Sequence, residues 1–285
     1  MTLFALTLLL AAAVAHAGWN YIAKKAGGGA VFAWMFSVVS CALYLPLALW
    51  ATLQSMPSIG LPAAGVLLAT IVAHLAYFLV LQRGYRVGDL SLVYPLARGT
   101  GPAIAMLLAV LLLGERPSWL VVGGGLLITG GVFALAGGAF DRRSSTRGAI
   151  AYGLATGIVI AVYTLVDKLA VSTFQLPPLL VVYLIDAGRL LLLAPLALGR
   201  RGSVRREWHE RRGPILALGI LCPLSYILAL TAMVTTPVTY IAPAREVSIL
   251  IGTLMGTQWL AEGGARRRVP GAVAIVAGLV ALSVG

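Results

Sequence analysis

The chain has 285 residues, of which 60% are hydrophobic and 11% are charged. A soluble domain usually carries about 25% charged residues, so the composition excludes a soluble or disordered protein and favours one surrounded by lipid. The net charge of +12 does not indicate nucleic-acid binding, because the basic residues form short clusters between apolar runs, as in the cytoplasmic loops of membrane proteins.

Apolar runs of about 20 residues, long enough to cross a bilayer, recur about ten times along the chain. The first five predicted spans are Leu3–Ile22, Ala30–Thr52, Leu61–Gln82, Leu90–Leu113 and Trp119–Ala139. The second five are Gly148–Lys168, Pro178–Leu198, Pro214–Val234, Thr239–Ala261 and Val269–Val284. Ala15-His16-Ala17 resembles a signal cleavage site, but no positive segment precedes it, so we expect the first span to be retained.

The loops differ strongly in charge, which predicts how the chain is oriented. Basic residues gather in alternate loops, whereas the remaining loops offer only Arg116 and Lys168. Because positive loops stay in the cytoplasm, both termini are expected on the non-cytoplasmic side of the inner membrane.

The two halves of the chain resemble each other at a constant offset of 147 residues. This offset pairs identical residues: Arg98 with Arg245, Glu115 with Glu262, Gly124 with Gly271, and Gly131 with Gly278. Since each half holds an odd number of spans, the second half must enter the membrane from the opposite side. The predicted fold is therefore all-α and integral to the membrane, with ten transmembrane helices arranged as two inverted five-helix repeats, residues 1–140 and 148–285, joined by a linker at 141–147. Inverted repeats around a midplane site are a common transporter design.

Four motifs resemble the drug/metabolite transporter superfamily, specifically ten-helix proteins with two EamA domains. They are His16-Ala17-Gly18-Trp19-Asn20, Tyr94-Pro95-Leu96-Ala97-Arg98-Gly99, Leu113-Gly114-Glu115-Arg116 and Tyr163-Thr164-Leu165-Val166-Asp167-Lys168. The resemblance covers essentially the whole chain and implies a transporter, with exporters of small metabolites among similar proteins. It also implies relatives that carry sugar phosphates or nucleotide sugars, or that flip lipid-linked head groups.

Two arginines, Arg98 and Arg245, are predicted inside their spans at matching repeat positions. Each costs about 2.5–3.5 kcal/mol near the bilayer centre, so each needs compensation. Either they pair with acids or backbone carbonyls, or they face a wet cavity and bind the carboxylate or phosphate of a substrate. Glu246 adjoins Arg245 but is expected to point about 100° away around the helix.

Polar and aromatic residues recur at helical spacing near these arginines, which favours a shared binding cavity. On the first span His16, Trp19 and Asn20 share one face, and on the third His74 and Tyr77 do the same. The predicted substrate-binding residues are Arg98, Arg245, His16, Trp19, Asn20, Tyr77, Tyr94, Tyr163 and Tyr226. An interfacial aromatic belt is the alternative for Trp19.

Asp167 is the candidate for proton coupling, because carboxylates inside membranes often relay protons. The adjacent Lys168 could instead place it at the interface. Asp186 and Arg189, three residues apart, are predicted to pair with each other within one helix. Glu115 and Glu262 end their spans and are predicted to bond loop backbone.

The sequence thus predicts a secondary transporter, an exporter by resemblance, that moves a small anionic or zwitterionic metabolite by alternating access. It contains no P-loop, no catalytic motif and no paired metal ligands, so we expect no enzyme activity, no metal and no cofactor. The alternatives are a flippase for a lipid-linked head group, an intramembrane enzyme and a non-transporting receptor. The expected partners are the substrate and the lipid bilayer, with a proton as the candidate coupling ion. The expected state is a monomer or a weak homodimer, and no nucleic acid is expected.

Overall fold

A computed structural model describes residues 1–87, 90–136, 147–259 and 265–285. All regular elements in these ranges are helical. A helix satisfies its own backbone hydrogen bonds, which a lipid-exposed chain requires. The elements are α1 (Leu3–Ala26), α2 (Ala30–Ser55), α3 (Leu61–Val87), α4 (Leu90–Leu113), α5 (Trp119–Ala136), α6 (Arg147–Lys168), the π-helical turn η1 (Leu169–Thr173), α7 (Pro178–Leu198), α8 (Arg201–Thr235), α9 (Val238–Ala244), α10 (Val247–Trp259) and α11 (Ala265–Val284).

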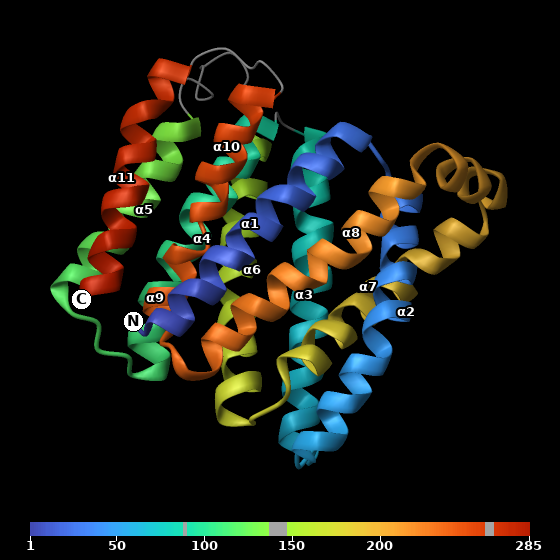
Figure 1. The fold of residues 1–285 in the computed structure, drawn as a ribbon, viewed down its shortest axis with the longest axis horizontal. Coiled ribbons are helices and arrows are strands. Elements are labelled where there is room, and N and C mark those ends of the chain that lie inside the picture. The colour runs from blue at the N-terminus through green and yellow to red at the C-terminus, as the bar shows by residue number, and fades with distance from the viewer. Residues whose placement is uncertain (88–89, 137–146, 260–264) are drawn as a thin grey trace.

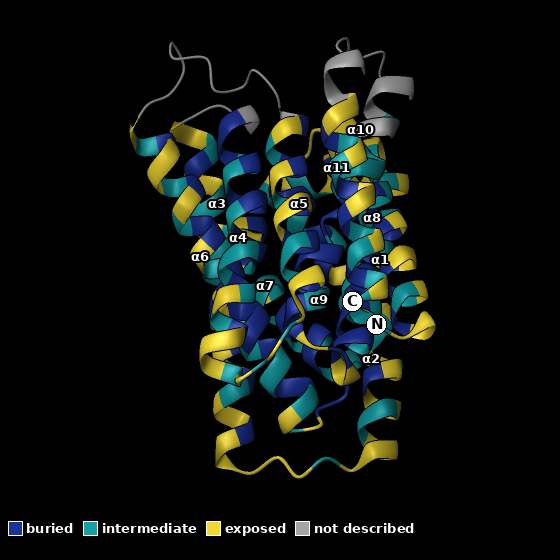
Figure 2. Cartoon of the chain, turned by 90° about the vertical axis from the view of Figure 1, so that its left-hand side faces the viewer, coloured by how far each residue is buried: buried dark blue, intermediate teal, exposed yellow. Residues whose placement is uncertain are grey.

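Seven of the described helices are long and apolar enough to cross a membrane. Shorter apolar segments occupy Trp119–Leu135 and Val269–Val284. Figure 2 shows the buried residues on the helix faces that point inward, with exposed residues outside. The exposed residues include many leucines and valines, as expected where lipid rather than water surrounds the helices.

The predicted ninth span, Thr239–Ala261, is wrong as one continuous helix. The chain forms α9, turns at Arg245 and Glu246, and resumes as α10. Two further boundaries differ: α8 begins at Arg201 and is kinked at Arg211, and the sixth helix continues into η1. The predicted linker residues 141–146, with the span ends Ala139 and Ala261 and with Glu262, lie outside the described residues.

Corresponding helices of the two predicted halves have corresponding packing partners. Helix α1 packs on α8 and α10, whereas α6 packs on α3 and α4. Likewise α2 packs on α8, and its counterpart α7 packs on α3. Two further contacts join a helix to its own counterpart: α2 packs on α7, and α5 packs on α11. Figure 1 shows α5 beside α11 at one end of the molecule and α2 beside α7 at the other. The two chain termini lie near each other in Figures 1 and 2.

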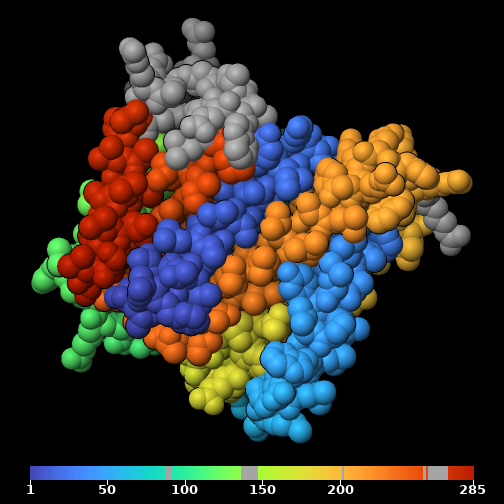
Figure 3. All heavy atoms as spheres, in the orientation of Figure 1, coloured from blue at the N-terminus to red at the C-terminus, as the bar shows by residue number. Residues whose placement is uncertain are grey.

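One face of the bundle is closed by α1. In Figure 3 this helix crosses the face diagonally between α10 and α8, with α2 beyond α8. Its inner side carries small residues, including Ala5, Ala12, Ala13 and Ala17, all of which are buried. Small side chains allow neighbouring helices to approach closely, so α1 lies tightly over the polar residues described next.

Candidate functional site

The side chain of Arg98 on α4 is paired with Glu246 at the break between α9 and α10. The Arg98 Nε atom lies 3.0 Å from the Glu246 Oε2 atom, and both side chains are buried. The two atoms do not form a well-aligned hydrogen bond. Glu246 was expected to point away from Arg245 and forms no ion pair with it; its carboxylate meets Arg98 on a different element instead.

Arg245 lies on an aromatic ring instead of a carboxylate. Its guanidinium carbon is 4.9 Å from the centre of the Tyr226 ring, a cation–π distance. Among the described residues no acidic side chain forms an ion pair with it. Since Arg98 already has Glu246, Arg245 is the stronger candidate of the two for binding an external anion.

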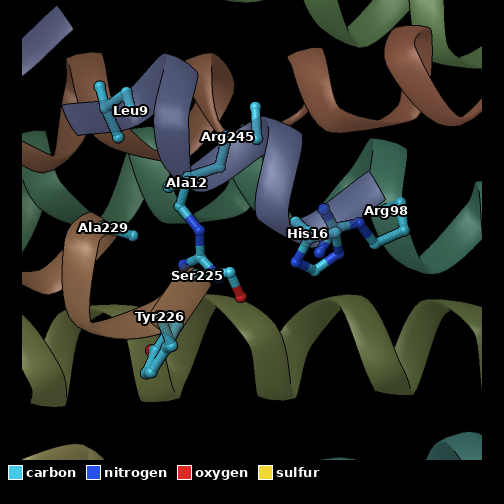
Figure 4. Close-up of a pocket in the computed structure, with 9 residues that line it drawn as sticks. Leu9, Ala12, His16, Arg98, Ser225, Tyr226, Ala229 and Arg245 are labelled. Carbon is cyan, nitrogen blue, oxygen red and sulfur yellow. The ribbon is translucent and has the colours of Figure 1, made fainter. Parts of the chain in front are cut away.

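Both arginines line one small cavity in the core (Figure 4). Helix α1 contributes His16 and three apolar residues, and α8 contributes Ser225, Tyr226 and Ala229. The cavity has a volume of about 20 Å³, which is the space needed by one water molecule or little more. The structure thus shows a closed form, in which a metabolite would need the helices to separate.

Asp167 on α6 lies in a second polar cluster beside this cavity. Its carboxylate is fully buried. It accepts hydrogen bonds from the hydroxyl groups of Thr70 and Tyr226. The Nε2 atom of His74 lies 3.0 Å from Asp167 Oδ2 and 3.3 Å from the Tyr226 hydroxyl. Tyr226 therefore touches both clusters, with its hydroxyl on Asp167 and its ring beneath Arg245.

Lys168 does not pair with its neighbour Asp167. Its ammonium group donates to the backbone carbonyls of Met233, at 2.8 Å, and Thr236, at 3.1 Å. A cation on terminal carbonyls is favourable at a helix C-terminus. Asp167 is consequently left in the core with neutral hydroxyl donors and one histidine.

The tyrosines predicted for the site gather around Asp167. Tyr163 stacks on His74 with ring centroids 4.1 Å apart, and its ring meets that of Tyr77 at 5.6 Å. Tyr226 joins them at 6.5 Å from Tyr163. Tyr94 lies half-buried on α4, one turn before Arg98. Three helices, α3, α6 and α8, thus supply one aromatic group.

Trp19 and Asn20 do not line the cavity that holds the arginines. Trp19 touches the His16 ring, with centroids 4.9 Å apart, but it packs against an apolar cluster with Phe32 and Leu218. The Asn20 side chain donates to the backbone carbonyl of His16 at 2.8 Å. Within the described residues the structure therefore brings His16 to the arginines, whereas Trp19 packs against α2 and α8 and Asn20 bonds to the backbone of its own helix.

The predicted pairing of Arg189 with Asp186 is confirmed, and Glu115 bonds backbone as predicted, but at the start of a helix and not in a loop. Arg189 and Asp186 pair within α7 at 2.7 Å, and Ser37 and Ser40 on α2 bond to them. Glu115 accepts hydrogen bonds from the backbone N–H groups of Val238, at 2.7 Å, and Thr239, at 2.9 Å. These are unpaired donors at the start of α9, so the carboxylate serves as a cap from outside the helix.

Sequence reasoning missed three members of the two clusters. Glu246 was assigned no partner, Thr70 carried no motif, and His74 was noted only as a neighbour of Tyr77. The positions of His74 and Thr70, four residues apart, put both on one face of α3. That spacing was a usable signal, but it does not reveal that this face meets Asp167.

Comparisons with known proteins agree with this architecture. Residues 147–284 match the EamA-like transporter family. A solved crystal structure aligns with 98% of this chain and 96% of its own, with a TM-score of 0.74 and 16% sequence identity. At this identity the likeness concerns the fold alone. A search of curated proteins finds no match.

Proposed function

We propose that the chain is a secondary transporter of a small anionic or zwitterionic metabolite. The match of residues 147–284 to the EamA-like transporter family supports a multi-pass membrane transporter. The substrate binds in the central cavity, with its acidic group on Arg245. The observation that carries this proposal is the position of Arg245: it lines a core cavity with Arg98 and His16, and no carboxylate of the described residues pairs with it.

The energetics favour a ligand at this arginine. An arginine within the membrane core needs compensation, and the Tyr226 ring supplies only part of it, about 0.5–2 kcal/mol for a cation–π contact. A carboxylate or phosphate would form charge-assisted hydrogen bonds with the guanidinium fork. The aromatic residues around Tyr163 would form the wall of the site against the rest of the substrate.

We further propose ten spans in two inverted repeats, residues 1–140 and 148–285, which alternate between two open states. The exchange of packing partners between the halves supports this arrangement. The glycines predicted to be equivalent support it as well, because Gly124 meets Gly278 while Gly131 meets Gly271. A two-fold axis relating α5 to α11 would produce this crossed pattern. The closed cavity fits an intermediate in which neither side is open.

The test is uptake of radiolabelled compounds into proteoliposomes that contain the full chain. The panel comprises L-serine, glycerate, glycerol 3-phosphate and a lipophilic cation. We expect uptake of at least one acid, reduced roughly tenfold or more by Arg245→Gln, which corresponds to a loss of about 1.4 kcal/mol or more in substrate binding. The matched control is Arg116→Gln, which removes a positive charge from an exposed loop residue and should leave uptake unchanged.

Uptake of the cation, with no effect of Arg245→Gln, would contradict the proposal. Movement of a fluorescent anionic lipid between leaflets, with no acid transported, would favour the flippase instead.

A further inference from the structure

The charged side chains in the core of the bundle have charges that sum to zero. Four of the six are buried, and Arg189 and Arg245 are half-buried; the described set comprises three arginines and three acids: Arg98, Arg189, Arg245, Asp167, Asp186 and Glu246. With every group ionised and the histidines neutral, this core carries no net charge. A low-dielectric region tolerates paired charges but penalises a net charge by several kcal/mol per ion.

The entry of an anion disturbs this balance. If a monoanion binds at Arg245, the buried groups and the substrate together carry one negative charge. The empty core has room for about one water molecule, so once the helices close around the substrate there is little water to solvate this charge. One additional proton on a core carboxylate would restore neutrality.

Asp167 is the acid best placed to receive that proton. Asp186 and Glu246 each pair with an arginine, at 2.7 and 3.0 Å. Asp167 has no arginine or lysine partner among the described residues, since the ammonium group of Lys168 bonds to the backbone carbonyls of Met233 and Thr236 instead. Its partners are two hydroxyl groups and His74, whose Nε2 atom lies 3.0 Å away and can hold or pass a proton.

Tyr226 connects the proton site with the anion site. It donates to Asp167, lies 3.3 Å from His74 and supports Arg245 on its ring. The other titratable or charged groups facing this region are Tyr77 from α3, Arg98 from α4 and Tyr163 from α6 itself. The Asp167 site and the Arg245 site are therefore in contact with the same side chain, so a change in charge at one site alters the electrostatic environment of the other.

We infer that the Asp167–His74 pair takes up one proton when a monoanion binds at Arg245, so that the proton and the anion cross the membrane together. The proton adds to the carboxylate of Asp167, with the His74 Nε2 atom 3.0 Å away to pass it on, and the charge of the pair rises from −1 to zero. This inference rests on the proposed anion site. Because an inward proton gradient would then favour uptake, the coupling runs opposite to the export implied by the family resemblance.

A matched pair of substrates tests the stoichiometry. L-serine and glycerate have the same carboxylate and nearly the same size, but serine carries an ammonium group where glycerate has a hydroxyl. We expect glycerate uptake to bring in one proton, measured as alkalinisation outside the proteoliposomes, whereas serine uptake brings in none. In Asp167→Asn, glycerate should move without a proton and generate a current. Proton-free glycerate uptake by the unaltered chain would overturn the inference while leaving the anion site intact.

A ligand-free measurement keeps the inference testable if neither compound is transported. Infrared spectroscopy of the reconstituted protein detects the C=O band of a protonated carboxyl group. We expect no such band from Asp167 at neutral pH. In Arg245→Gln, which leaves the core with one negative charge, the band should appear and should vanish in the double variant with Asp167→Asn. Arg116→Gln should show no band. A band from Asp167 in the unaltered chain at neutral pH would overturn the inference, because the resting site would already hold its proton.

Discussion

Gly124 and Gly278 meet backbone to backbone where α5 crosses α11. A Cβ atom added to Gly124 would lie 2.8 Å from the Gly278 carbonyl oxygen. Two helical turns further along α5, a Cβ on Gly131 would lie 2.8 Å from the carbonyl oxygen of Gly271. Such distances leave no room for any side chain, so these glycines allow the two helices to pack at their closest approach.

Gly124→Ala should therefore destabilise the protein by forcing α5 and α11 apart. Overpacking of this kind costs about 1–3 kcal/mol. The control is Gly130→Ala on the same helix, where an added Cβ meets nothing within 4 Å. Thermal unfolding in detergent should show a lower Tm for Gly124→Ala alone. Equal Tm values for the two variants would mean that the contact between the helices is loose.

Glu246→Gln should leave Arg98 as an uncompensated buried cation. Breaking a buried pair by removing one partner costs about 3–5 kcal/mol, so the Tm should fall. Inorganic phosphate at millimolar concentration should then raise the Tm of this variant more than that of the unaltered chain, because an anion can replace the lost carboxylate. Glu207→Gln is the control: it breaks a pair with Arg211 outside the cavity, where the two atoms are 2.5 Å apart. If phosphate stabilised both variants equally, its effect would not arise at Arg98.

Tyr226→Phe should separate the two roles of this tyrosine. The ring that supports Arg245 remains, whereas the hydroxyl group that donates to Asp167 is lost. We expect acid uptake to persist with weakened dependence on the pH gradient. Tyr226→Ala removes both contacts and should abolish uptake. The measurement is uptake with and without an imposed proton gradient, and unchanged gradient dependence in Tyr226→Phe would show that the hydroxyl group takes no part in coupling.

Glu115→Gln should weaken the link between α4 and α9. The carboxylate accepts from two backbone N–H groups, at 2.7 and 2.9 Å, and hydrogen bonds to charged groups contribute about 1.5–3 kcal/mol each. The amide retains one acceptor oxygen, so we expect a Tm decrease smaller than that of Glu115→Ala. Hydrogen exchange should report faster exchange at Val238 and Thr239. Full protection of both N–H groups in Glu115→Ala would contradict this capping role.

The sequence by itself determined the features that depend on local spacing. Apolar runs located the helices as far as Val234. A run of apolar residues in lipid is helical because its backbone N–H and C=O groups find no water and must bond to one another. The pairing of Asp186 with Arg189 followed from a separation of three residues on one helix. The constant offset of 147 residues predicts that Arg98 and Arg245 are counterparts, and it singled out the four glycines that pack, in crossed pairs, where α5 meets α11.

The tertiary structure alone decided which helix faces meet. Glu246 reaches Arg98 only because the predicted ninth helix breaks at that point, and His74 reaches Asp167 across 93 residues of sequence. Helical periodicity shows that a face is polar but contains no information about the partner that this face finds. A buried charge must be compensated, but an acid on any neighbouring helix could compensate a buried arginine. Only the packing of the helices, among them α3, α4, α6 and α8, selects which polar side chains meet.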